Sequence, residues 1–246
     1  MISRVMSNTF KFHIELSMTR FIILAAALAV AAAPVPKTDP LPPITEKLWN
    51  DSADNLKQLA VAIHAYHDVN GHFPQNLTDG KGTPLLSWRV QLLPFLDADD
   101  LFKQFKQTEA WDSEHNKKLL EKMPKAFAPV RVKGALGETY YQGFVGRDTF
   151  FRTEKPIAFN SISDGCSNTA MLVEAEKSVP WTKPIDLSFD AAKDLPKLGG
   201  FFDGAFNMLM ADGSVMRVKK GFNPVVMKLA IQIADGSVID VESLRK

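Results

Sequence analysis

The segment TEKLWNDSADNLKQLAVAIHAYHDVN, residues 45–70, decides the fold of this chain. Apolar residues recur along it every three or four positions, which is the period of a helix that buries one face. Thr45 can cap the start of such a helix, Gly71 lies just past its end, and Pro74 prevents it from resuming. One long helix is therefore predicted. Its apolar positions are Leu48, Leu56, Leu59, Ala60, Ile63 and Tyr66.

The section that follows is predicted to be helical but broken. Ser87 has the chemistry of a cap for a short helix that ends near residue 96. Residues 97–105 and 113–123 also show apolar residues at helical spacing. Trp88 and Trp111 are expected to hold this section against the rest of the domain.

Beyond residue 129 the pattern changes to that of strands. Asp212-Gly213 separates two short apolar runs, which is the strongest short-range sign of a β-hairpin. Asn223-Pro224 opens a last helix, expected to reach residue 233 and to be followed by a turn and a short final strand. A long helix, broken helices and then antiparallel strands make an α+β domain. The predicted strands are residues 139–145, 169–175, 206–210 and 214–218.

The chain begins with a segment typical of a secretory signal peptide. Residues 21–33, FIILAAALAVAAA, carry no charge and directly follow Arg20. This run is shorter than the roughly 20 residues that cross a bilayer as a helix, although an uncleaved membrane anchor remains the alternative. Cleavage is expected after Ala31 or Ala32, because Pro34 is a poor residue to follow a cut.

These features divide the chain into three parts. They are a signal peptide over residues 1–31, a proline-rich linker over 32–44 and a single domain over 45–246. Either Met1 or Met18 can be the start of translation. The mature protein is expected to be periplasmic or extracellular, with no stable membrane span after processing.

The composition excludes several classes of function. Lys and Arg number 29 against 28 Asp and Glu, so the charge balance does not point to a nucleic-acid partner. Cys166 is the only cysteine and cannot form an internal disulfide. The sequence holds no glycine-rich phosphate loop, no CxxC pair and no serine-hydrolase elbow, and no cofactor is predicted.

Four residues are candidates for binding a ligand. Trp181 lies between two prolines and close to Lys183, and an exposed indole there would suit a sugar or a peptide. Alternatively, Trp181 folds back over the edge of the sheet. Glu174 and Glu176 are two apart on a predicted strand and should share one face. They would form an acid pair, a calcium site or, as the ordinary alternative, a solvated strand face.

The stretch SDGCSNT at residues 163–169 combines hydroxyls, a thiol and a carboxylate. A nucleophile at Cys166 would need a general base, for which His115 is a candidate. The alternative is a turn, in which Asp-Gly supplies the left-handed position and the polar side chains bond their own backbone. The residues to which we assign such turn roles are Asp164, Gly165, Asn168, Asp212 and Gly213.

Three histidines lie near the end of the long predicted helix. His64 and His67 are three apart, so their rings can meet on one face of the helix. Together with His72 or Asp68 they could hold zinc, or they could simply pack and bond to backbone carbonyls. No HExxH pattern is present, and no metal site is predicted.

Six blocks of the sequence resemble the bacterial domain of unknown function 1559 family. The first is NLKQLAVAIHAYHD at residues 55–68, followed by GHFP at 71–74. The resemblance implies a pilin-like or pseudopilin-like α+β architecture, in which a long N-terminal helix packs on an antiparallel sheet, here with short helices inserted. The other blocks, in the family's order, are residues 86–96, 111–118, 163–169, 179–184 and 206–214.

Two features depart from the family pattern. Many members carry a prepilin leader, with glycine before the cleavage point and glutamate five residues into the apolar run. Here Arg20 precedes Phe21, and Ala25 holds the fifth position, so a prepilin peptidase should not process this chain. Many members also have histidine ten residues before the aspartate of the Asp-Gly turn, where this chain has Phe202.

A pilin-like domain would bury one stripe of the long helix against the sheet. The helix residues expected to be buried are Leu56, Leu59, Ile63 and Tyr66, and those expected to be exposed are Lys57, Gln58 and Asp68. The expected partners on the sheet are Met171 and Val173, or Leu209 and Val215.

The leading hypothesis for function is an exported, non-enzymatic envelope protein that acts by binding or packing. Its partner would be an unidentified envelope protein or glycan. The main alternative is a periplasmic small-ligand or glycan-binding protein that uses the Trp181 loop. A third hypothesis is an envelope hydrolase that uses Glu174, Glu176 or His67, which requires these groups to converge in one cleft.

Overall fold

The computed structural model describes most of the predicted domain, namely residues 41–131, 136–152, 155–200, 202–237 and 239–245. The predicted signal peptide and most of the predicted linker lie outside the described residues. Among the helices described, none is long and apolar enough to cross a membrane.

The long helix α1 spans Glu46–Asn70, as the sequence predicts. Thr45 caps its start, because its hydroxyl oxygen accepts a hydrogen bond from the backbone N–H of Leu48 at 3.3 Å. Gly71 ends the helix in the left-handed conformation, with φ of 76°, and its N–H donates to the carbonyl of His67.

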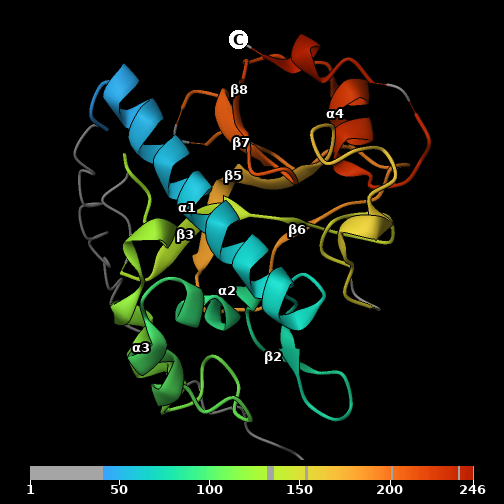
Figure 1. Cartoon of the computed structure of the whole chain (residues 1–246). Helices are drawn as coiled ribbons and strands as arrows, with labels where there is room; N and C mark the ends of the chain where they lie inside the picture. The colour runs from blue at the N-terminus through green and yellow to red at the C-terminus, as the bar shows by residue number, and fades with distance from the viewer. Residues whose placement is uncertain (1–40, 132–135, 153–154, 201, 238, 246) are drawn as a thin grey trace, which may run out of the picture. The chain divides into compact units, whose positions relative to one another are not determined.

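A four-stranded antiparallel sheet forms the centre of the domain, in the order β3-β5-β7-β8 (Figure 1). The hairpin predicted around Asp212-Gly213 is confirmed, because β7 and β8 pair with Leu209 opposite Val215. Two small sheets accompany it, β1 with β2 antiparallel and β4 with β6 parallel. The strands are β1 Leu77–Thr78, β2 Pro84–Leu86, β3 Glu138–Gln142, β4 Phe144–Val145, β5 Ala170–Pro180, β6 Leu187–Ser188, β7 Phe206–Met210 and β8 Val215–Val218.

Helix α1 packs across one face of this sheet, which confirms the α+β fold class (Figure 1). The predicted stripe of the helix is buried, and Lys57, Gln58 and Asp68 are exposed, as expected. Met171 and Leu209 share the hydrophobic core with that stripe, and Val215 packs against it.

Val173 is the exception among the expected partners, because it belongs to the core on the other face of the sheet. The pairing of β5 with β7 shifts between Ala170 and Leu172, so Met171 and Leu172 both join the core beneath α1. A shift of this kind breaks the simple alternation of strand faces on which the expectation depended.

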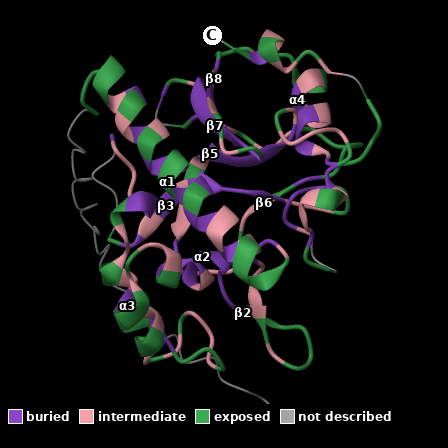
Figure 2. Ribbon diagram, in the orientation of Figure 1, coloured by how far each residue is buried: buried purple, intermediate pink, exposed green. Residues whose placement is uncertain are grey.

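The second face of the sheet is covered by α4, Pro224–Ile231. Met227 and Ile231 of this helix are buried in one core with Phe206 and Met208 of β7. The strands β5 and β7 therefore have both faces covered, and most of their length is buried (Figure 2).

Short helices fill the section between α1 and β3, as predicted, but two of the predicted helices differ. The helix expected over residues 88–96 is divided into the α-helix α2, Trp88–Gln91, and the 3-10 helix η1, Leu93–Phe95. Residues 113–123 were expected to be α-helical, whereas the structure has a 3-10 helix, η2, over Asn116–Lys122. The buried amide of Asn116 donates to three carbonyls of the preceding turn and accepts from the N–H of Lys106, which fixes that turn in a non-helical path. The other short helices here are α2 Trp88–Gln91, η1 Leu93–Phe95, α3 Asp99–Gln104 and η3 Lys125–Phe127.

The C-terminal end also differs from the expectation. Helix α4 ends at Ile231 rather than at residue 233, and the expected final strand is a 3-10 helix, η5, over Val241–Leu244. Of that strand only the isolated pairing of Arg245 with Val218 is present among the described residues. Val241 and Leu244 are three apart, and in a 3-10 helix they share a face, which packs on the core beneath α4.

Replacing Ile63 by alanine should lower the free energy of unfolding by about 2–5 kcal/mol, because its side chain is fully buried between α1 and the sheet. Urea denaturation of the purified domain measures the change. Lys57→Ala is the matched control on the exposed face of α1, and it should shift the free energy by less than about 0.5 kcal/mol. Equal effects at the two positions would contradict the assigned packing.

Candidate functional site

Glu174 on β5 is a carboxyl group with none of its surface exposed, buried between α1 and the sheet. Ser52 of α1 donates its hydroxyl hydrogen to Oε1 of Glu174. The backbone N–H of Asn207 on β7 donates to Oε2 at 2.7 Å. Both carboxyl oxygens are thus engaged by the fold, one by the helix and one by the neighbouring strand.

Tyr141 on β3 extends this network to a third strand. Its phenol oxygen lies 2.9 Å from Oγ of Ser52 and accepts from Nδ2 of Asn55 at 3.3 Å. On the other side, Nδ2 of Asn207 donates to the carbonyl of Trp49 at 3.1 Å. Two polar side chains of α1 and one backbone carbonyl therefore bond to β3, β5 and β7.

Burial changes the ionisation of this network. Loss of solvent raises the pKa of Glu174 to about 8, and the hydrogen bonds from Ser52 and Asn207 lower it by less. Burial, and then the nearby Glu174, raises the pKa of the Tyr141 phenol. Glu174 is therefore mostly protonated at neutral pH, and it holds the helix and the sheet together as a neutral hydrogen-bonding group.

The expectation of a solvated face shared by Glu174 and Glu176 is wrong. Glu176 is half-exposed, with its carboxylate 3.9 Å from the ammonium of Lys197, whereas Glu174 is enclosed. The pairing of β3 with β5 shifts between Thr139 and Tyr141, so β5 does not continue as a regular strand from one glutamate to the next. The two residues do not form an acid pair.

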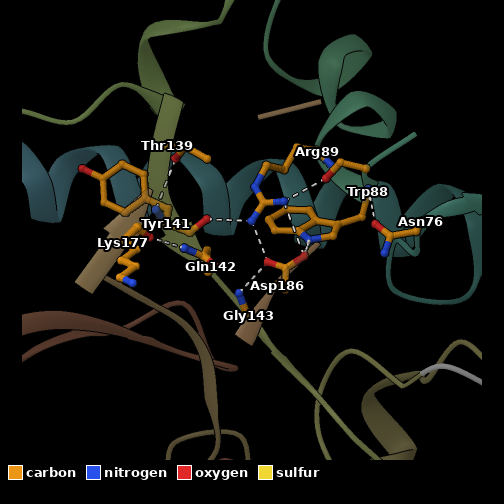
Figure 3. Close-up of polar contacts among 10 residues, drawn as sticks. Asn76, Trp88, Arg89, Thr139, Tyr141, Gln142, Gly143, Lys177 and Asp186 are labelled. Atoms are coloured by element: carbon orange, nitrogen blue, oxygen red, sulfur yellow. Dashed lines mark hydrogen bonds and ion pairs between the residues drawn. The ribbon is translucent and has the colours of Figure 1, made fainter. Parts of the chain in front are cut away.

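A second buried network centres on Arg89 and Asp186 (Figure 3). Both side chains are fully buried, and their closest charged atoms are 2.6 Å apart. Asp186 also accepts from Nε1 of Trp88 at 3.0 Å and from the N–H of Gly143 at 2.9 Å. Arg89 donates in addition to the carbonyl of Tyr141, at 2.9 Å.

These contacts explain how a charged pair survives inside the domain. Burial raises the pKa of the Asp186 carboxyl, and the Arg89 guanidinium is the largest opposing influence. A buried ion pair is stabilised when its other polar atoms also find partners. Trp88 and Gly143 supply such partners to Asp186, whereas Nε of Arg89 is buried without a hydrogen-bond partner among the described residues. This ion pair was not predicted from the sequence, where the only local sign of it is an arginine inside the apolar run LSWRVQLLPFL.

Trp181 is not exposed, so the proposed exposed aromatic site is wrong. Its side chain is fully buried, and Nε1 donates to the carbonyl of Leu120 at 2.9 Å. The indole stacks on Phe127 of η3, with ring centres 5.8 Å apart, so Trp181 folds back into the core against the short helices. Lys183 lies instead over the ring of Trp111, 5.3 Å from its centre.

Three of the Asp-Gly segments, at residues 164–165, 212–213 and 235–236, lie in turns, and the first turn contacts each of the other two. The carboxylate of Asp164 accepts from the N–H groups of Asp235 and Gly236, at 2.7 and 3.0 Å. Asn168 donates its side-chain amide to the carbonyl of Asp164, and Gly165 has φ of 92°. The sequence Ala-Asp-Gly-Ser-Val occurs twice in the chain, at residues 211–215 and 234–238. Asp164 thus joins its own turn to the second copy.

The first copy of that sequence closes the β7–β8 hairpin. The carboxylate of Asp212 accepts from the N–H of Ser214 at 2.8 Å, and Gly213 has φ of 88°. Nε2 of His64 lies 2.9 Å from the carbonyl oxygen of Ala211 and links this turn to α1. The hairpin turn is therefore held against α1 by the contact between His64 and Ala211.

The candidate nucleophile and the histidines do not form a catalytic group. Burial and the nearby Asp212 raise the pKa of the Cys166 thiol, which disfavours the reactive thiolate. His115 bonds instead to the carbonyl of Gln104 at 2.8 Å. Among the described residues, no group of three or more His, Cys, Asp or Glu is placed to hold a metal ion.

The groups named for a hydrolase are not brought together either. The ring of His67 packs between Phe73 and Phe159, with centres 4.7 and 4.6 Å away. His67 is fifteen positions beyond Ser52, the residue of α1 that bonds to Glu174, which places it roughly 22 Å along the helix. The convergence that hydrolysis requires is not found in the described part of the chain.

Residues 50–133 match a family model described as a protein of unknown function (DUF1559). The match begins in α1 and takes in the section of short helices that follows it. No curated protein and no solved structure matches the chain.

The contribution of Glu174 to stability should depend on pH. Its pKa in the folded state is about 8, above the ordinary value of 4.5, so the folded protein binds this proton more tightly than the unfolded chain. The stabilisation is therefore complete below pH 4.5 and is lost as the pH rises through about 8. In the Glu174→Gln variant the side chain keeps its size and can still form hydrogen bonds, but it does not ionise, so this contribution should not depend on pH.

Urea denaturation of both proteins from about pH 5 to pH 9 tests this expectation. The free energy of unfolding of the wild type, minus that of the Glu174→Gln variant, should fall across this range. Glu176→Gln serves as the control, since Glu176 is half-exposed and should show no such trend. A difference for Glu174→Gln that does not vary with pH would mean that Glu174 is ionised when buried.

Proposed function

We propose that this protein, whose residues 50–133 form a DUF1559 family domain, is an exported, non-enzymatic envelope protein that acts by binding or packing. One observation carries the proposal: both buried carboxyl groups, Glu174 and Asp186, have their oxygens engaged by the fold itself. A catalytic carboxyl must reach its substrate, so these two are better suited to holding the domain together.

Export is supported by the N-terminal sequence. A positive residue, Arg20, precedes a short apolar run that ends in small residues, and a proline-rich linker follows. The proposal does not include assembly into a pilus-like filament, because Arg20 and Ala25 replace the residues expected in a prepilin leader.

A binding or packing role is supported by the architecture. A long helix across an antiparallel sheet is the arrangement that the resemblance to pseudopilins implies, and such domains act through their surfaces. The partner would be another envelope protein or a glycan, and Trp181 is excluded from the contact because it is buried.

Export is tested by expressing the full chain in a bacterium, separating the cell fractions and measuring the intact mass of the protein in each by mass spectrometry. We expect a soluble periplasmic or extracellular species that begins at Ala32 or Ala33. Leu24→Asp should leave a longer precursor in the cytoplasm, because a charge interrupts the apolar run. Thr38→Asp is the matched control, since it adds the same charge beyond the run. A species that retains Phe21 and pellets with membranes would show an anchor instead.

The binding role is tested by cross-linking in intact cells, purification and identification of the attached proteins and glycans. The wild type and Glu174→Gln should recover the same partner, because Glu174 acts inside the domain and not at a surface. Recovery of the protein with no partner would contradict a binding role. Loss of the partner in a folded Glu174→Gln variant would mean that this carboxyl takes part in function directly.

A further inference from the structure

We draw no further inference here: the strongest candidate, the apolar cavity between Trp49 of α1, Phe202 and the exposed Lys219–Lys220 pair after β8, carries no proposal, because its two aromatic rings are buried against each other and nothing in the structure shows what covers it.

Discussion

The hydrogen bond that joins Ser52 of α1 to Glu174 of β5 sets the position of the long helix on the sheet. An apolar stripe alone allows a helix to slide or rotate by small amounts, because hydrophobic contact is not directional. A buried carboxyl group does not allow this, since a partner lost in the interior is not replaced by water. The bond from the N–H of Asn207 to the other oxygen then ties the same residue to β7.

Tyr141 extends this constraint to the section of short helices. Its phenol group belongs to the network of Ser52 and Asn55, while its backbone carbonyl accepts from Arg89. One residue of β3 thus connects the helix–sheet interface to the buried ion pair of Arg89 and Asp186. A displacement of α1 would disturb both networks, because neither has spare partners.

The helices and turns that are determined by neighbouring residues in the chain could be predicted from the sequence. The period of apolar residues and the Thr45 and Gly71 ends gave α1, and Asp212-Gly213 gave the hairpin of β7 and β8. Which residues of β5 face α1 could not be predicted from the sequence, because both faces of the strand are covered and its pairing with each neighbouring strand shifts. Alternation carries no information about a strand that is buried on both faces.

The interior polar groups were not predictable for a different reason, which is distance along the chain. Ser52 and Glu174 are 122 positions apart, and Arg89 and Asp186 are 97 apart. Near each residue the sequence shows only a serine on a helix or an arginine in an apolar run. Trp181 was misassigned in the same way, since its neighbours Pro180 and Thr182 indicate a loop but not what covers it.

The packing of Phe151 on Trp88, beside Asp186, depends on a close approach that only glycine permits. A Cβ on Gly143 would collide with the ring of Phe151, which packs against Trp88. The same glycine donates its N–H to Asp186 and so completes the set of partners that makes this carboxylate unavailable. Gly143 therefore sets both the position of the Phe151 ring on Trp88 and one of the hydrogen bonds that stabilise the buried Asp186 carboxylate. Any larger residue at position 143 would disturb the aromatic packing and the buried ion pair together.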